Sequence, residues 1–251
     1  MNRIGLWGVL GTLALALIGG VFGFFVLPRT QDSSLSPWAA WCSALGITTQ
    51  SFAVGPPATN STASEITLTH ELLGPPRPDD IGRGATLALQ CSMCHGPTGI
   101  SVANTPNLAG QYSTVIYKEL RDFKSRARSN AIMNAMANTL TDEAMRQIAY
   151  YYASLPKLHE AHPLADAPDI VKWGAPSRNV APCGSCHGDI DHILAGPWLA
   201  GEPGAYIRAQ LVAFANGERS NDINGQMRAM ARGLTAAEIE QTALYYAGNA
   251  K

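Results

Sequence analysis

The stretches that decide this chain are Cys91-Ser92-Met93-Cys94-His95 and Cys183-Gly184-Ser185-Cys186-His187. Both have the pattern C-x-x-C-H, which is typical of covalent attachment of a c-type haem. Cysteines three residues apart lie on one face of a short helix, so both sulfurs can form thioethers and the next histidine can bind the iron. The sequence therefore predicts two covalently attached haem c groups.

Two other kinds of site use closely spaced cysteines. A zinc knuckle needs a second Cys/His pair for each site, and a thioredoxin-like motif needs a βαβ pattern. Neither feature is visible in the sequence, and four of its five cysteines already fill the two motifs. The fifth, Cys42, has no assigned role, and a buried thiol is its simplest interpretation.

The size and charge of the chain limit its possible functions. Its 251 residues are enough for about two domains. The formal net charge is -1, which does not favour nucleic acid as a partner. We expect neither nucleic acid nor a small-molecule substrate to bind this chain.

The N-terminal region contains a long uncharged segment. Ile4 to Leu27 is a run of 24 residues without a charge, and as a helix it would span about 36 Å, enough to cross a bilayer. A cleaved signal peptide is the alternative, but its apolar core is shorter. We expect residues 1–28 to be a single-pass anchor in the bacterial cytoplasmic membrane. Haem is attached outside that membrane, so the haem domains are expected in the periplasm.

Residues 29–78 are rich in Pro, Ser, Thr and Gly and are interpreted as a periplasmic tether. Trp38 and Trp41 interrupt this composition. They indicate either docking on a haem domain or another subunit, or a position at the membrane interface.

The rest of the chain is an internal repeat with two copies, and the first motif cysteines of the two copies are 92 residues apart. Pro106-Asn107-Leu108-Ala109-Gly110 corresponds to Pro197-Trp198-Leu199-Ala200-Gly201. This repeat predicts domains over residues 79–155 and 169–251, joined by a proline-containing linker over 156–168.

Both copies have the features of helical domains. Apolar residues recur at helix spacing, and Thr141 and Thr235 stand where a final helix begins, with N-cap character. No alternating run is long enough for a sheet. The predicted fold class is all-α: a transmembrane helix followed by two tandem helical haem domains.

The sixth iron ligand decides the chemistry, because His95 and His187 fill only one face of each haem. Methionine is expected for electron transfer, since His/Met ligation raises the potential and closes the coordination shell. The repeat offers two matched pairs, Met133 with Met227 and Met136 with Met230. It does not choose between them, but a ligand on an irregular loop upstream of the last helix favours Met133 and Met227.

Other residues are expected to support the haem groups. A proximal imidazole needs an acceptor for its Nδ1–H, and the carbonyl groups of Pro106 and Pro197 are the predicted acceptors. Arg128 and Arg219 lie at matched positions. They are interpreted either as partners of haem propionates or as exposed charges at helix ends.

Both copies carry, in order, C-x-x-C-H, P-x-L-A-G, F-x4-R, a methionine, and L-T followed by Y-Y. Over about residues 79–251 the chain thus resembles the di-haem cytochrome c4 family, which implies an all-α fold of two tandem class I cytochrome c domains. The resemblance implies axial ligation by Met133 and Met227 and the carbonyl role of Pro106 and Pro197. It also implies two low-spin haem groups that pass electrons toward a terminal oxidase.

We therefore expect an electron-transfer protein and not an enzyme. Its donor would be a quinol-oxidising complex or a soluble cytochrome, and its acceptor a haem–copper terminal oxidase of a respiratory chain. The alternative is the cytochrome subunit of a periplasmic dehydrogenase. A haem enzyme needs an open axial position, which the matched methionines in both copies disfavour.

Overall fold

The computed structural model describes residues 11–17, 19–20, 63–67, 69, 73–157, 164–187 and 196–248. The chain forms two compact units, Met1–Gly55 and Pro56–Lys251. In the first unit the described residues, 11–17 and 19–20, are helical. Within the described part of the chain, no helix has the length and apolar character needed to cross a membrane. Most of the predicted anchor and the patch of Trp38, Trp41 and Cys42 lie outside the described residues.

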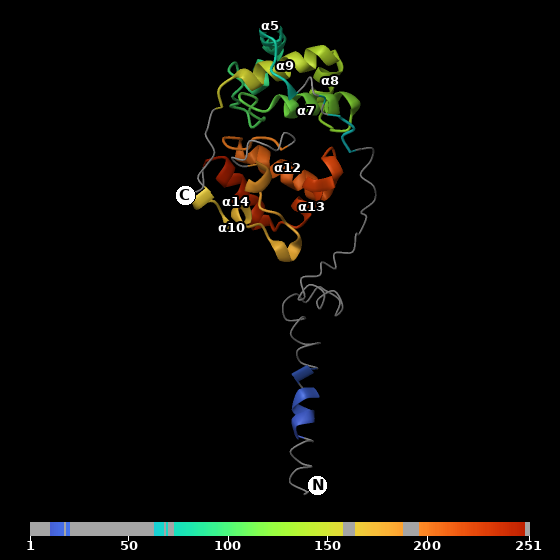
Figure 1. Cartoon of the computed structure of the whole chain (residues 1–251), viewed down its shortest axis with the longest axis vertical. Coiled ribbons are helices and arrows are strands. Elements are labelled where there is room, and N and C mark those ends of the chain that lie inside the picture. Colours follow the sequence, from blue (N-terminus) through green and yellow to red (C-terminus); the bar gives the residue numbers. More distant parts are fainter. Residues whose placement is uncertain are drawn as a thin grey trace. The chain divides into compact units, whose positions relative to one another are not determined.

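The second unit contains two helical domains (Figure 1). The elements of the first domain are α5 (Pro78–Leu87), the 3-10 helix η2 (Ala88–Cys91), α6 (Ser92–His95), α7 (Ser113–Ser125), α8 (Ala131–Asn138) and α9 (Asp142–Ser154). Helix α5 packs closely on α9 at Gly84. A Cβ atom there would lie 2.0 Å from the carbonyl oxygen of Gln147, so only glycine permits this approach.

The second domain repeats the main helices in the same order, but its first α-helix is shorter and it contains further 3-10 turns. Its elements are η3 (Leu164–Asp166), α10 (Asp169–Lys172), η4 (Pro176–Arg178), α11 (Gly184–His187), α12 (Gly204–Asn216), η5 (Ile223–Gly225), α13 (Gln226–Arg232) and α14 (Ala236–Tyr246). Helix α10 ends early because Gly174 turns the chain with φ +68°. A single antiparallel bridge then joins Ala175 to Val180.

The predicted helix starts are confirmed. The Thr141 side chain accepts a hydrogen bond from the backbone N–H of Ala144 at the start of α9. Thr235 and Glu238 form a reciprocal capping box at the start of α14. Such caps satisfy N–H groups that have no partner inside the helix, and each contributes about 1 kcal/mol.

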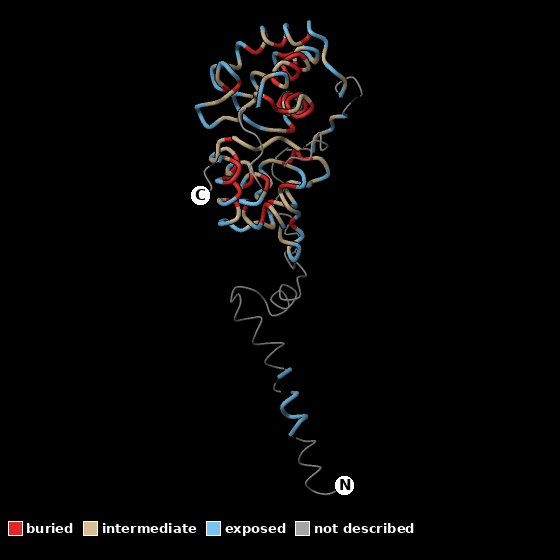
Figure 2. The backbone as a smooth tube through the Cα atoms, turned by 60° about the vertical axis from the view of Figure 1, so that its left-hand side comes forward, coloured by how far each residue is buried: buried red, intermediate tan, exposed pale blue. Residues whose placement is uncertain are grey.

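Each domain has its own core, and buried residues line the inner faces of its helices (Figure 2). The core of the first domain includes Met145, Ile148 and Tyr152, and that of the second includes Val171 and Ala243. No strand of a sheet occurs among the described residues, apart from the isolated bridge. The all-α fold with tandem domains is therefore confirmed.

Candidate functional site

The first C-x-x-C-H motif lies on a helical turn with a sharp end. Cys91 is the last residue of η2, and Cys94 and His95 lie on α6. Gly96 ends α6 with φ +79°, and a Cβ atom there would lie 1.9 Å from the carbonyl oxygen of Ile100. The chain then returns so that the Pro106 carbonyl oxygen lies 2.8 Å from His95 Nδ1.

The second motif has the same geometry. Cys186 and His187 lie on α11, and the backbone N–H of His187 donates to the carbonyl of Cys183 at 3.0 Å. His187 Nδ1 lies 2.9 Å from the carbonyl oxygen of Pro197. The contacts predicted for Pro106 and Pro197 are therefore both present.

These contacts decide which imidazole nitrogen can act as a ligand. When Nδ1–H donates to a carbonyl, Nε2 keeps its lone pair and can bind iron. Burial lowers the pKa of His95 and of His187, and the proline carbonyls offset only part of this effect. Both rings are thus kept neutral, the form that binds a metal.

The first cysteine of each motif does not have the features of an activated thiol. Burial raises the pKa of Cys91, and it raises that of Cys183 to about 11, so neither thiol is an activated thiolate. All four thiols are free of disulfides. The described residues contain no group of three Cys, His, Asp or Glu that could hold a metal ion by itself.

Several polar atoms indicate that the second site fits a bound organic group. Among the described residues, Trp198 Nε1, Thr242 Oγ1 and Tyr246 OH are buried without a hydrogen-bond partner. Trp198 directly follows Pro197, and burial together with the nearby Cys183 raises the pKa of Tyr246. Buried polar atoms without a protein partner are expected beside a site that a bound group would fill, so the residues present fit the group that the motif predicts.

The methionine candidates lie on helices and not on loops, which corrects our expectation. Met133 is in the first turn of α8, whose N-cap Asn130 accepts the N–H groups of residues 132 and 133. Met227 is the second residue of α13. Met133 packs against the first core, and Met227 and Met230 both pack against the second. Met230 Sδ also lies 3.2 Å from the backbone N–H of Ala181.

The motif F-x4-R has a structural explanation. The guanidinium carbon of Arg128 lies 4.7 Å from the ring centre of Phe123, and that of Arg219 lies 4.5 Å from the ring centre of Phe214. Each arginine therefore stacks on the phenylalanine of its own motif by a cation–π contact. Their side chains are only 11% and 14% exposed, so the interpretation as exposed helix-end charges is wrong.

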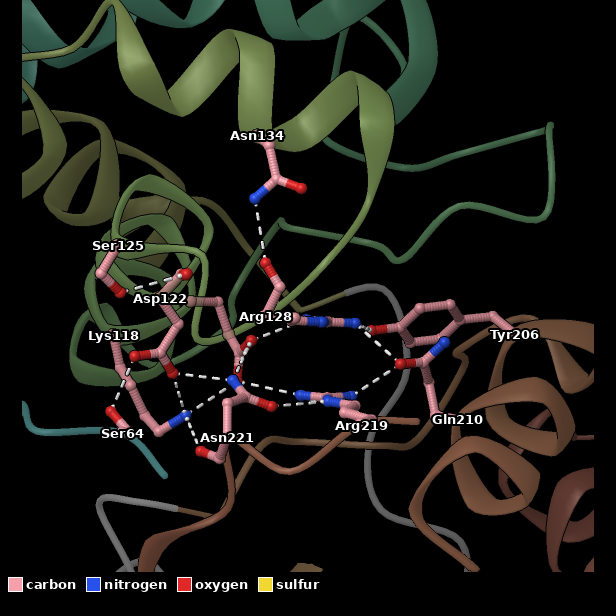
Figure 3. A network of polar contacts seen from close by, with 11 residues as sticks. Ser64, Lys118, Asp122, Ser125, Arg128, Asn134, Tyr206, Gln210, Arg219 and Asn221 are labelled. Carbon is pink, nitrogen blue, oxygen red and sulfur yellow. Dashed lines mark hydrogen bonds and ion pairs between the residues drawn. The ribbon is translucent and has the colours of Figure 1, made fainter. Parts of the chain in front are cut away.

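The two arginines meet in a buried polar network between the domains (Figure 3). Glu119 on α7 accepts from Arg128 Nη1 at 2.7 Å and from Arg219 Nη2 at 3.0 Å. Gln210 Oε1 on α12 accepts from both guanidinium groups at 2.8 Å. A haem propionate would have to share guanidinium groups that already have these partners, and propionate binding stays a prediction.

A second part of the network joins α7 to the other domain. Asn221 Nδ2 donates to Glu119 at 3.0 Å and to Asp122 at 2.7 Å. Lys118 Nζ donates to Asp122 at 2.7 Å and to the carbonyl of Asn221 at 2.9 Å. Burial opposes ionisation of Glu119, but Arg219, Arg128 and Lys118 outweigh it and hold its pKa well below the ordinary value.

The partners in this interface could not be predicted from the sequence. Glu119 and Asn221 lie 102 residues apart along the chain, and nothing local distinguishes them from solvated polar residues. The one available signal is the repeated Arg-Ser-Asn after each F-x4 segment.

Comparison with known proteins agrees with this architecture. A family model described as cytochrome c matches residues 81–156. Cytochrome c4 of Thiocapsa roseopersicina is 36% identical over 166 residues, which cover 63% of this chain and 86% of that protein. A thiosulfate dehydrogenase electron acceptor of Stutzerimonas stutzeri is 35% identical over 170 residues, covering 64% of this chain and 79% of that protein.

Solved structures show the same likeness. The crystal structure of reduced recombinant cytochrome c4 from Pseudomonas stutzeri superposes with a TM-score of 0.61 at 29% sequence identity. The match covers 67% of this chain and 97% of that chain. It extends over nearly the whole of the solved chain, and the chain described here belongs to the di-haem cytochrome c4 family.

Proposed function

We propose that this chain carries two covalently attached haem c groups and transfers electrons through them. The observation that carries the proposal is the geometry found in both copies. Each motif histidine donates Nδ1–H to a proline carbonyl, beside two cysteines that form no disulfide. Bound haem supplies a one-electron iron couple whose potential depends on its axial ligands and surroundings.

The residues of the chain have separate roles in this proposal. Cys91, Cys94, Cys183 and Cys186 hold the groups covalently, and His95 and His187 are the proximal ligands. Met133 and Met227 are proposed as the ligands on the opposite faces. A filled coordination shell prevents small molecules from binding the iron, so the proposed role is that of a carrier and not an enzyme.

We further propose that residues 1–28 anchor the protein in the bacterial cytoplasmic membrane, with the haem domains in the periplasm. The uncharged run from Ile4 to Leu27 supports this position. An anchored carrier serves fixed neighbours in a respiratory chain. We propose a quinol-oxidising complex or a soluble cytochrome as donor and a haem–copper terminal oxidase as acceptor.

A second candidate is the cytochrome subunit of a periplasmic dehydrogenase. The similarity to a protein named as the electron acceptor of thiosulfate dehydrogenase favours this candidate. Both candidates use the same two haem groups, and they differ in the proteins with which those groups exchange electrons.

Purification of the full chain from membranes at native expression level distinguishes these functions. Haem content and spectra test the two covalent groups, and mass spectrometry identifies the proteins that co-migrate. Oxidase subunits in a fixed ratio support the leading proposal, and dehydrogenase subunits support the second. A chain found only in the soluble fraction would refute the anchor, and fewer than two covalent haem groups would refute the haem assignment.

A further inference from the structure

The peptide group that holds His95 is itself held by the other domain. Its carbonyl, from Pro106, accepts the proton of His95 Nδ1 at 2.8 Å. Its N–H, from Asn107, donates to Glu202 Oε2 at 2.9 Å. Because this C=O and N–H belong to one peptide unit, the imidazole of the first domain and the carboxyl of the second lie at its two ends.

The same arrangement exists in the opposite direction. The carbonyl of Pro197 accepts from His187 Nδ1 at 2.9 Å, and the N–H of Trp198 donates to Gln111 Oε1 at 2.9 Å. Gln111 follows Gly110 in the first domain as Glu202 follows Gly201 in the second. The two contacts are therefore related by the repeat, with an amide in one and a carboxyl in the other.

Both side chains are fixed in place. Gln111 is 7% exposed and Glu202 is 5% exposed. Gln111 Nε2 also donates to the carbonyl of Trp198 at 2.9 Å, and Asn107 Nδ2 donates to the carbonyl of Gly201 at 2.8 Å. Gln111 is thus held by a second hydrogen bond of its own across the interface, and the peptide group that faces Glu202 is held by the bond from Asn107 to Gly201, the neighbour of Glu202.

Consecutive hydrogen bonds polarise one another. An acceptor on the peptide N–H makes the carbonyl more electron-rich, so it draws the Nδ1 proton more strongly and makes the imidazole a better donor to iron. A more strongly donating ligand stabilises ferric over ferrous iron, which lowers the reduction potential.

We propose that Glu202 and Gln111 are positioning residues that tune the proximal histidine of the opposite domain, so that each haem potential depends on a side chain of the other domain. This inference rests on the proposed ligation by His95 and His187. The potential of the first haem then depends on the carboxyl of Glu202, and the potential of the second haem depends on the amide of Gln111. Both groups supply an acceptor oxygen to the peptide N–H, so the neutral carboxyl and the amide have the same role.

The test is a redox titration of the full-length protein with both haem groups, followed by NMR with the two sets of haem-methyl resonances resolved. The variants are Glu202→Ala and Gln111→Ala, and Glu202→Gln is the matched control because it keeps an acceptor oxygen. Burial raises the pKa of Glu202 to about 8, so at pH 6 the carboxyl is neutral like the amide. If the alanine variant does not fold, Glu202→Leu fills similar space without an acceptor.

We expect Glu202→Ala to raise the potential of the first haem only, and Gln111→Ala that of the second only. The expected shift is up to about tenfold in the reduction equilibrium, which is about 59 mV for one electron. Glu202→Gln should leave both potentials unchanged.

Unchanged potentials in the alanine variants, or a shift confined to the haem of the mutated domain, would overturn the inference. A shift with Glu202→Gln as large as the shift with Glu202→Ala would also overturn the inference. Haem content and ligation are measured first on the wild type. If two His-ligated haem groups are present, any of these overturning results contradicts the inference about Glu202 and Gln111 but not the proposed function. If they are absent, the proposed function and this inference both fail.

Discussion

Glu119→Gln is the substitution that tests the domain interface most directly. The carboxylate of Glu119 lies between Arg128 and Arg219, at 2.7 Å and 3.0 Å from their guanidinium nitrogens. The amide is nearly the same size, so the change removes one charge and little volume. Two guanidinium groups from different domains would then lie side by side without their shared anion.

The expected cost follows from the burial of these groups. Breaking a buried ion pair by neutralising one partner costs about 3–5 kcal/mol, because the other charge stays buried and unpaired. The side chain of Glu119 keeps 19% exposure, and Gln210 still accepts from both arginines. We therefore expect a cost at the lower end of this range, a loss of about 3 kcal/mol in the free energy of unfolding.

The assay is urea unfolding at neutral pH, followed by circular dichroism. Glu240→Gln is the matched control, because Glu240 pairs with Arg208 inside one domain and both side chains are more than 40% exposed. This control should leave stability nearly unchanged. If Glu119→Gln costs no more than Glu240→Gln, the network does not stabilise the interface and our reasoning is wrong.

The same variant predicts a pH dependence. The folded-state pKa of Glu119 is lowered from its ordinary value of 4.5, so its contribution is present above that value and is lost as the pH falls toward the folded-state pKa. The stability difference between wild type and Glu119→Gln should therefore shrink on acidification. A difference that grows toward low pH would contradict this sign.

Three further predictions concern single positions. Met133→Ala and Met227→Ala should each remove the weak long-wavelength band of Met-ligated ferric haem from one domain, whereas Met136→Ala should leave the visible spectrum unchanged; the reverse result would move the ligand to Met136. Burial raises the pKa of Glu202 from 4.5 to about 8, so the wild type should lose stability as the pH rises through this window. Glu202→Gln should have the same free energy of unfolding as the wild type at pH 4 and should be more stable than the wild type at pH 9, by about 5 kcal/mol at most. If urea unfolding gives the two proteins the same pH profile, this prediction is wrong. Gly84→Ala should destabilise the first domain by about 1–3 kcal/mol, because its Cβ would overlap the backbone of α9; an unchanged melting temperature would show that the helices can separate freely.

The sequence was sufficient for features that depend on neighbours along the chain. The C-x-x-C-H motifs place their sulfurs and imidazole by the geometry of one helical turn, and the caps at Thr141 and Thr235 need only residues up to three positions away. The duplication, the helical class and the proline carbonyls followed from matched spacing in two copies. Repetition made each of these assignments stronger than a single copy would have been.

Tertiary structure alone decided how the domains meet. Arg128 and Arg219 look alike in the sequence, and only folding shows that both use Glu119 of one domain and Gln210 of the other. The reason is physical: a buried charge must be paired, but the partner is set by which surfaces dock, and local spacing carries no information about that. Local spacing in the chain was enough to predict the motifs and the helical class of each domain, whereas the contacts between the two domains became known only from the folded structure.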